Sequence, residues 1–415
     1  MRPIFLFSLL FVGLCAFSQR TKNLQPGHWR SELAMNDRLF IPFFLDISKN
    51  SNRIRLEVIN AEERILLRDI EFKNDSVYAH FPEMDAQIVF QISEKGNELR
   101  GYWLNHARKE PIKIPLNAYI TTENTERISF SKTENNSSIA NLTGKWDVTF
   151  NPFEGKKRKA IGSFEVKETK VTGTFLTETG DYRFLEGNIN GNEFALSSFN
   201  GSWAFYFTGT ITRDSIKGKY YSGVSFSTDW IASKNEQVKL REQEELTYVI
   251  NNSDFNFTEL EELNGKPFSF PGKKYKNKVV ILQIMGTWCP NCIDEINYFK
   301  TLYSKYNEQG LEIVALAYEV GDNRKAQLKK LQAFKKRTGI PYKVIVAGTS
   351  KTEVASSHFP MLNGVMSFPT TIFVDRKGKI QKIFTGFSGP ATGKAYADLK
   401  DEIQNEVEVL LGLLK

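Results

Sequence analysis

Cysteine and histidine are scarce in this sequence, and several other features are missing. Only 3 Cys and 4 His occur among 415 residues, which leaves little material for a metal site, and we expect neither a metal nor another cofactor. No basic run is interleaved with aromatic residues, so the net charge of +7 indicates a solvated basic surface and no nucleic-acid partner. Proline and glycine, at 14 and 28 residues, are too few for a fibrous chain.

The composition that remains is that of a folded chain with several domains. Hydrophobic residues make up 41% and charged residues 25% of the sequence, and the mean hydropathy is -0.36. This balance excludes a wholly disordered chain and a polytopic membrane protein. The length of 415 residues predicts about two to four domains.

The N-terminus has the pattern of a secretory signal peptide, predicted at residues 1–18. Arg2 supplies a positive start, and residues 4–14 form an apolar run too short to span a bilayer. Small residues at Ala16 and Ser18 occupy the positions that signal peptidase recognises. We therefore expect cleavage before Gln19.

Lipid attachment at Cys15 is disfavoured, because it requires a small residue before the cysteine and Leu14 stands there. No later stretch reaches the ~18 consecutive apolar residues of a membrane helix. The expected location is the periplasm or cell envelope, without stable membrane insertion.

Two segments of the N-terminal half share short motifs at one offset. Gly27–Trp29 recurs as Gly144–Trp146, and Leu99–Tyr102 recurs as Ile216–Lys219, each 117 positions later. Both segments are rich in β-branched and aromatic residues in short runs broken by turns, which is typical of antiparallel β structure. We interpret them as two β modules, the second a repeat of the first, each a sandwich or a small barrel.

The predicted modules cover residues 19–135 and 136–235. A polar, turn-rich stretch at 131–138 lies between them, and a charged linker at 236–250 follows the second. From 251 to 415 the pattern changes to alternating strands and helices. Strands are expected at 278–285, 311–317, 342–346, 370–374 and 379–384, and helices after Cys289, at 323–337 and at 396–414.

One cysteine pair follows the first of these strands. Gly286–Cys292 reads Gly-Thr-Trp-Cys-Pro-Asn-Cys and opens a helix, in which Pro290 suits the first turn. A cysteine at a helix N-terminus is favoured as a thiolate, which attacks disulfides. We assign Cys289 as the nucleophile and Cys292 as the resolving thiol of a redox-active disulfide.

Residues 251–415 resemble the thioredoxin fold, and specifically the exported TlpA/ResA-like disulfide reductases of bacteria. The resemblance rests on Gly286–Cys292, which includes Trp288, and on Ser367–Thr371 (Ser-Phe-Pro-Thr-Thr). It implies a cis-proline at Pro369 facing the disulfide. It also implies that the backbone of Phe368 pairs with an extended substrate, although Phe368 also suits a plain core position.

The same resemblance places Glu295 near the active site, as a proton-transfer or substrate-recognition group or else as a solvated carboxylate. Thioredoxins proper hold a buried acid where this chain has Gln283, and many relatives have a proline where it has Asn297. The segment 347–364 resembles the extra element of TlpA-like proteins. Its His358 is interpreted as structural rather than catalytic.

The sequence therefore predicts a multidomain protein with two N-terminal, mainly antiparallel β modules and a C-terminal α/β thioredoxin-fold domain. The leading function is an exported thiol–disulfide oxidoreductase that reduces protein disulfides and is recharged by a membrane electron donor. The neutral Asn291 between the cysteines favours a reductase, because strong oxidants carry a cation-forming histidine there. A disulfide oxidase or isomerase, and a binding protein with a redox-sensitive accessory domain, stay open as alternatives.

Overall fold

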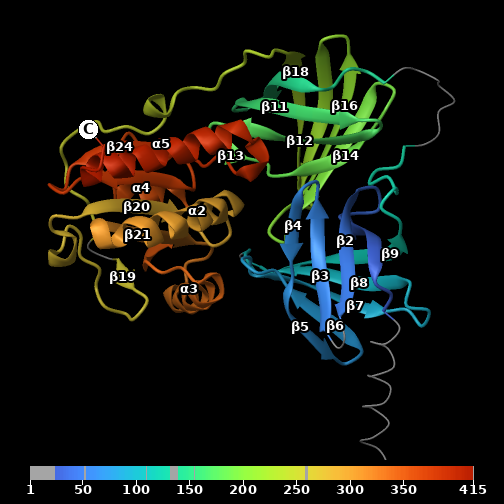
Figure 1. The fold of residues 1–415 in the computed structure, drawn as a ribbon, viewed down its shortest axis with the longest axis horizontal. Helices are drawn as coiled ribbons and strands as arrows, with labels where there is room; N and C mark the ends of the chain where they lie inside the picture. The colour runs from blue at the N-terminus through green and yellow to red at the C-terminus, as the bar shows by residue number, and fades with distance from the viewer. Residues whose placement is uncertain are drawn as a thin grey trace, which may run out of the picture.

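The computed structural model describes residues 24–50, 53–108, 110–130, 139–153, 155–257 and 260–414. The predicted signal peptide and the stretch 131–138 lie outside these residues. Three β sheets organise the described chain (Figure 1). Two are antiparallel and lie side by side, and the third carries the helices, so the predicted fold class is confirmed.

The first sheet is a near-barrel of nine antiparallel strands in the order β4-β3-β2-β1-β9-β8-β7-β6-β5. Trp29 on β1 is fully buried in its core, because inward and outward side chains alternate along the strand. The strands are β1 (Gly27–Ala34), β2 (Phe40–Asn50), β3 (Arg53–Asn60), β4 (Glu63–Leu66), β5 (Arg68–Lys73), β6 (Ser76–His80), β7 (Ala86–Ile92), β8 (Glu98–Asn105) and β9 (Ile112–Thr121).

The second sheet closes into an eight-stranded barrel, because β11 pairs with both β10 and β12, and the short β13 pairs with β12 outside the ring. Aromatic side chains fill the interior, including Phe150, Phe175 and Trp230. The strands are β10 (Gly144–Phe150), β11 (Arg158–Lys167), β12 (Lys170–Thr177), β13 (Gly180–Asp181), β14 (Leu185–Asn190), β15 (Glu193–Phe199), β16 (Ala204–Thr212), β17 (Ser215–Ser222) and β18 (Phe226–Lys234).

Residues 117 positions apart play the same part in the two antiparallel sheets. The indoles of Trp29 and Trp146 each donate a hydrogen bond to the carbonyl four residues earlier, at 3.2 and 2.8 Å. A Cβ on Gly101 or Gly218 would lie about 2 Å from a backbone oxygen of the paired strand, at 1.9 and 2.1 Å. Only glycine fits such a close approach of two backbones.

A buried arginine joins the two antiparallel sheets. The guanidinium of Arg127 donates hydrogen bonds to Ser197 Oγ at 2.8 Å, to Asn60 Oδ1 at 2.9 Å and to the carbonyl of Ile59 at 3.0 Å. Burial lowers the pKa of this group to about 10. Because a buried cation is costly unless it is fully hydrogen-bonded, these contacts hold the two sheets in one arrangement.

The third sheet has the order β19-β22-β21-β20-β23-β24, with β20, β21 and β22 parallel. Its strands are β19 (Glu261–Glu262), β20 (Val279–Met285), β21 (Leu311–Glu319), β22 (Lys343–Thr349), β23 (Thr370–Val374) and β24 (Ile380–Thr385). The helices are α2 (Pro290–Tyr306), α3 (Arg324–Thr338), α4 (Thr352–Ser357) and α5 (Lys394–Leu411). The elements expected between 278 and 414 are thus present, and the bounds given for them differ by at most three residues.

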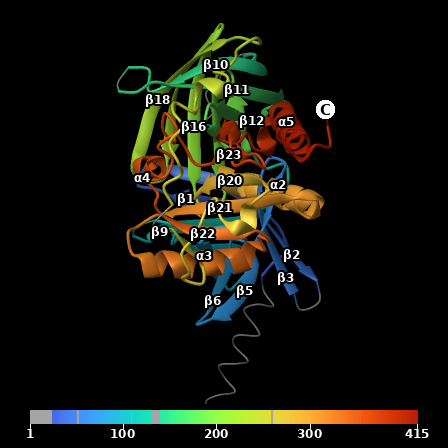
Figure 2. The same ribbon diagram turned by 90° about the vertical axis from the view of Figure 1, so that its left-hand side faces the viewer.

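Both faces of this sheet are covered, which explains the continuous apolar run along β20. Ile281 belongs to the cluster that includes residues of α2, α3 and α5, whereas Leu282 belongs to the cluster that includes Ala355 of α4. Figure 2 shows α2 and α4 on opposite sides of the sheet. Among the described residues, no helix has the length and apolar character needed to cross a bilayer.

Candidate active site

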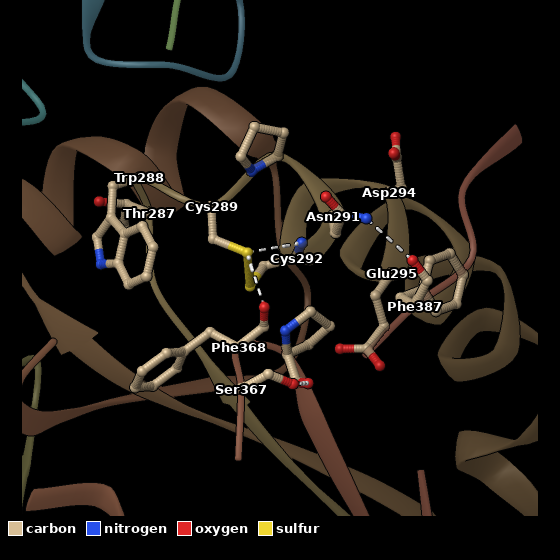
Figure 3. The surroundings of a disulfide bond; sticks show 12 residues. Thr287, Trp288, Cys289, Asn291, Cys292, Asp294, Glu295, Ser367, Phe368 and Phe387 are labelled. Carbon is tan, nitrogen blue, oxygen red and sulfur yellow. Dashed lines mark hydrogen bonds between the residues drawn. A yellow bond between two sulfur atoms is a disulfide. The ribbon is translucent and has the colours of Figure 1, made fainter. Parts of the chain in front are cut away.

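The dithiol lies where β20 gives way to α2 (Figure 3). Cys289 is the N-cap of the helix, and its Sγ accepts a hydrogen bond from the backbone N–H of Cys292 at 3.2 Å. The two cysteines form a disulfide with their Cα atoms 5.3 Å apart. The unpaired N–H groups and dipole of the helix terminus favour a thiolate on Cys289 in the reduced form.

The loop before β23 faces this disulfide. The carbonyl oxygen of Phe368 lies 3.4 Å from Cys289 Sγ, and the Phe368–Pro369 peptide bond is cis. The ring of Phe368 meets the indole of Trp288 edge to face at 5.5 Å, and both side chains are half-buried. Cys289 itself is only 5% exposed.

Glu295 is fully buried one turn beyond Cys292. Its carboxylate accepts hydrogen bonds from Gln283 Nε2 at 2.7 Å and from Thr371 Oγ1 at 2.6 Å. Burial raises its pKa to about 7, although these two hydrogen bonds oppose the shift. The alternative of a solvated carboxylate is therefore wrong, and Gln283 is a hydrogen-bond partner of the acid.

A second buried carboxylate supports the loop before the cysteines, and sequence reasoning missed it. Glu319 at the end of β21 accepts hydrogen bonds from the Thr287 N–H at 2.9 Å and from Thr287 Oγ1 at 2.7 Å. Lys330 Nζ lies 3.5 Å from the same carboxylate. The acid is the last residue of a buried apolar strand, which is the one signal that marks it in the sequence.

This contact gives a stability prediction. Thr287→Val removes the hydroxyl donor to a buried, ionisable partner and is expected to lower the free energy of unfolding by about 2 kcal/mol. Thr301→Val is the matched control, because the Thr301 hydroxyl bonds the Tyr298 carbonyl at the exposed face of α2. Its effect is expected within about 0.5 kcal/mol. Denaturant unfolding of the disulfide form measures both, and equal effects would contradict the assignment.

His358 lies away from the dithiol. Its Nδ1 is 2.8 Å from the hydroxyl of Tyr318, whose backbone carbonyl accepts a hydrogen bond from the Trp288 indole at 3.0 Å. The histidine thus contacts a residue that itself supports Trp288. In the described part of the chain, no cluster of three or more His, Cys, Asp or Glu is arranged to hold a metal ion.

The β modules also contribute to the surroundings of the dithiol. Ser202 Oγ donates a hydrogen bond to the Trp288 carbonyl at 2.9 Å, and Asn291 Nδ2 donates to Asp181 Oδ1 at 2.9 Å. Arg183 Nη1 donates to Asp294 Oδ2 at 2.7 Å. No motif or periodicity in the sequence relates these residues, since 86 to 111 positions separate the partners.

A dithiol at a helix N-terminus, opposite a cis-proline loop on a sheet of this order, defines the thioredoxin class of proteins. Residues 232–399 match the Redoxin family model. The thiol–disulfide oxidoreductase ResA of Geobacillus thermodenitrificans strain NG80-2 is 34% identical over 112 residues, and that of Bacillus subtilis strain 168 is 32% identical over 127 residues. These matches cover 27% and 31% of this chain and 57% and 63% of the relatives.

A solved thiol:disulfide interchange protein of the thioredoxin family from Chlorobium tepidum TLS overlaps 39% of this chain and 99% of its own, with 23% identity and a TM-score of 0.27. The C-terminal segment of this chain is a Redoxin domain related to the ResA thiol–disulfide oxidoreductases, and it carries the Cys289–Cys292 pair.

Proposed function

We propose that the protein is an exported thiol–disulfide oxidoreductase that reduces disulfides of cell-envelope proteins through the Cys289–Cys292 dithiol. The observation that carries the proposal is the position of Cys289 as N-cap of α2, with its Sγ 3.4 Å from the carbonyl of Phe368. An extended client segment can pair with the backbone beside Pro369 while its disulfide meets Cys289. Export is inferred from the N-terminal pattern of residues 1–18.

The proposed reaction conserves electrons and sulfur bonds. The Cys289 thiolate attacks one sulfur of a client disulfide, which forms a mixed disulfide and releases one client thiolate. The Cys292 thiolate then attacks Cys289 Sγ, which forms the Cys289–Cys292 disulfide and releases the second client thiolate. Two electrons pass to the client, so a thiol-bearing donor, proposed to be in the membrane, returns two electrons to the pair.

Glu295 is proposed to receive the proton that Cys292 loses before its attack. It follows Cys292 by one helical turn, and burial holds its pKa at about 7. A group with a pKa near the working pH both accepts and returns a proton readily. Neighbouring Gln283 and Thr371 donate to the carboxylate and hold it in place.

The reduction potential of the cysteine pair tests the direction of electron flow. The protein is recovered from cells after export, where the expected first residue is Gln19, and equilibrated with defined thiol buffers. A potential near or below the ~−270 mV of thioredoxin is expected for a reductase. A value near the ~−120 mV of strong oxidants would make the protein a disulfide donor instead. The Cys289→Ser, Cys292→Ser double variant supplies the baseline.

A further inference from the structure

The short strand β13, which pairs with β12 of the eight-stranded barrel, lies directly against the start of α2. Asn291, which stands between the two cysteines, donates from Nδ2 to Asp181 Oδ1 at 2.9 Å and to the Phe387 carbonyl at 3.1 Å. A Cβ on Gly180, where φ is +133°, would lie 2.4 Å from the same Nδ2. The barrel therefore touches the redox motif itself and not only its periphery.

A buried ion cluster next to β13 supports the same contact. Arg183 donates to Asp294 Oδ2 at 2.7 Å and from Nε to Glu63 Oε1 at 3.2 Å. The three side chains are 13%, 8% and 9% exposed, in the order Arg183, Asp294 and Glu63. Arg183 belongs to the barrel module, Asp294 to the N-terminal part of α2 and Glu63 to the near-barrel, so one guanidinium joins all three sheets near the cysteine pair.

The cluster around Arg183 contains more carboxyl groups than cations. The guanidinium of Arg183 forms ion pairs with Glu63 and Asp294, and the charge of Asp181 also favours its protonated form. Burial raises the pKa of Asp294 to about 7 and that of Asp181 to about 6, with Arg183 opposing both shifts. These charges lie beside the helix terminus on which the Cys289 thiolate forms, where the surroundings are buried and weakly screened.

We propose that Asp181 and Arg183 are positioning residues of the disulfide reaction, which hold Asn291 and Asp294 at the start of α2 and set the reduction potential of the Cys289–Cys292 pair. This inference rests on the proposed oxidoreductase function. The carboxylate of Asp181 disfavours the thiolate of the reduced form, whereas the guanidinium of Arg183 favours it. The β modules are then a part of the active site.

Two variants test the proposal through the sign of their effects. Asp181→Asn keeps the shape and an acceptor for Asn291 but removes a negative charge, so it is expected to stabilise the reduced form about threefold in the equilibrium with glutathione. This change corresponds to about +15 mV. Arg183→Met removes the cation and is expected to shift the equilibrium in the opposite direction, with partial recovery in Arg183→Lys. Alkylation rates at several pH values measure the pKa of the Cys289 thiol. This pKa is expected to fall in Asp181→Asn and to rise in Arg183→Met.

The measurements use the full chain at pH 8, above the raised pKa values of Asp181 and Asp294. Arg241→Met is the matched control, because Arg241 binds Glu178 in the turn between β12 and β13 at an exposed position. It is expected to leave the reduction potential of the cysteine pair unchanged. Shifts of the same sign, or an Asp181→Asn protein with the wild-type potential, would overturn the proposal. The Asp181→Asn measurement tests the proposal even if Arg183→Met does not fold. The proposed function is tested separately, by the disulfide-reducing activity of the wild-type protein.

Discussion

Cys292→Ser is expected to convert the protein into a covalent trap for its clients. The Cys289 thiolate still attacks a client disulfide, but no second thiol is present to resolve the mixed disulfide. When the variant is exported in cells, we therefore expect disulfide-linked complexes that survive denaturant and are separated by dithiothreitol. The partners in these complexes identify the clients, and each captured client is expected to carry its second cysteine as a free thiol.

Cys289→Ser is the matched control for this experiment, because it removes the nucleophile and leaves one buried thiol. It is expected to form no such complexes and to lose turnover down to the rate of the uncatalysed exchange. Trapping by Cys289→Ser at the level of Cys292→Ser would contradict the assigned roles of the two cysteines.

Glu295→Gln is expected to raise stability and lower activity together. The carboxyl group has a pKa of about 7 in the folded protein, against an ordinary value of 4.5, so folding is opposed once the group must ionise. The wild type therefore loses stability relative to the variant as pH rises from about 4.5 to 7, and the difference is constant above that range. It amounts to as much as about 3 kcal/mol at pH 8.

The activity of this variant tests the proposed proton transfer. Loss of a general base commonly slows a reaction about 10²-fold or more, so the reduction of a model disulfide is expected to slow by about that factor. Glu308→Gln changes an exposed carboxyl near the end of α2 and is the control for both readouts. Wild-type kinetics in Glu295→Gln would leave Glu295 a structural residue, and a pH-independent difference in stability would contradict its raised pKa.

Local patterns were enough to predict the redox motif and the elements around it. Cys289 and Pro290 define a helix start through capping and backbone geometry, which depend on neighbouring residues alone. The apolar run of β20 and the glycine after α3 mark a buried strand and a helix end for the same reason. The resemblance to a known family supplied the candidate role of Glu295. It also supplied Pro369, which is far from the cysteines in the sequence although the carbonyl of the preceding Phe368 lies 3.4 Å from Cys289 Sγ.

Short β-branched and aromatic runs broken by turns predicted antiparallel β modules but left the closure of each sheet open. Whether a sheet closes depends on how its first and last strands meet, and periodicity along one strand carries no such information. The pairing of β11 with β12 closes the second sheet into a barrel, whereas the first has the order β4 to β5 without a corresponding ring.

The sequence by itself determined the dithiol, its helix and the class of chemistry, because these depend on residues close together in the chain. Only the tertiary structure decided what surrounds them. Asn291 meets Asp181 across 110 positions, and Asp294 meets Arg183 across 111. Such contacts arise from the fit of folded surfaces to one another, so no pattern in the sequence could show the charges that they place beside the start of α2.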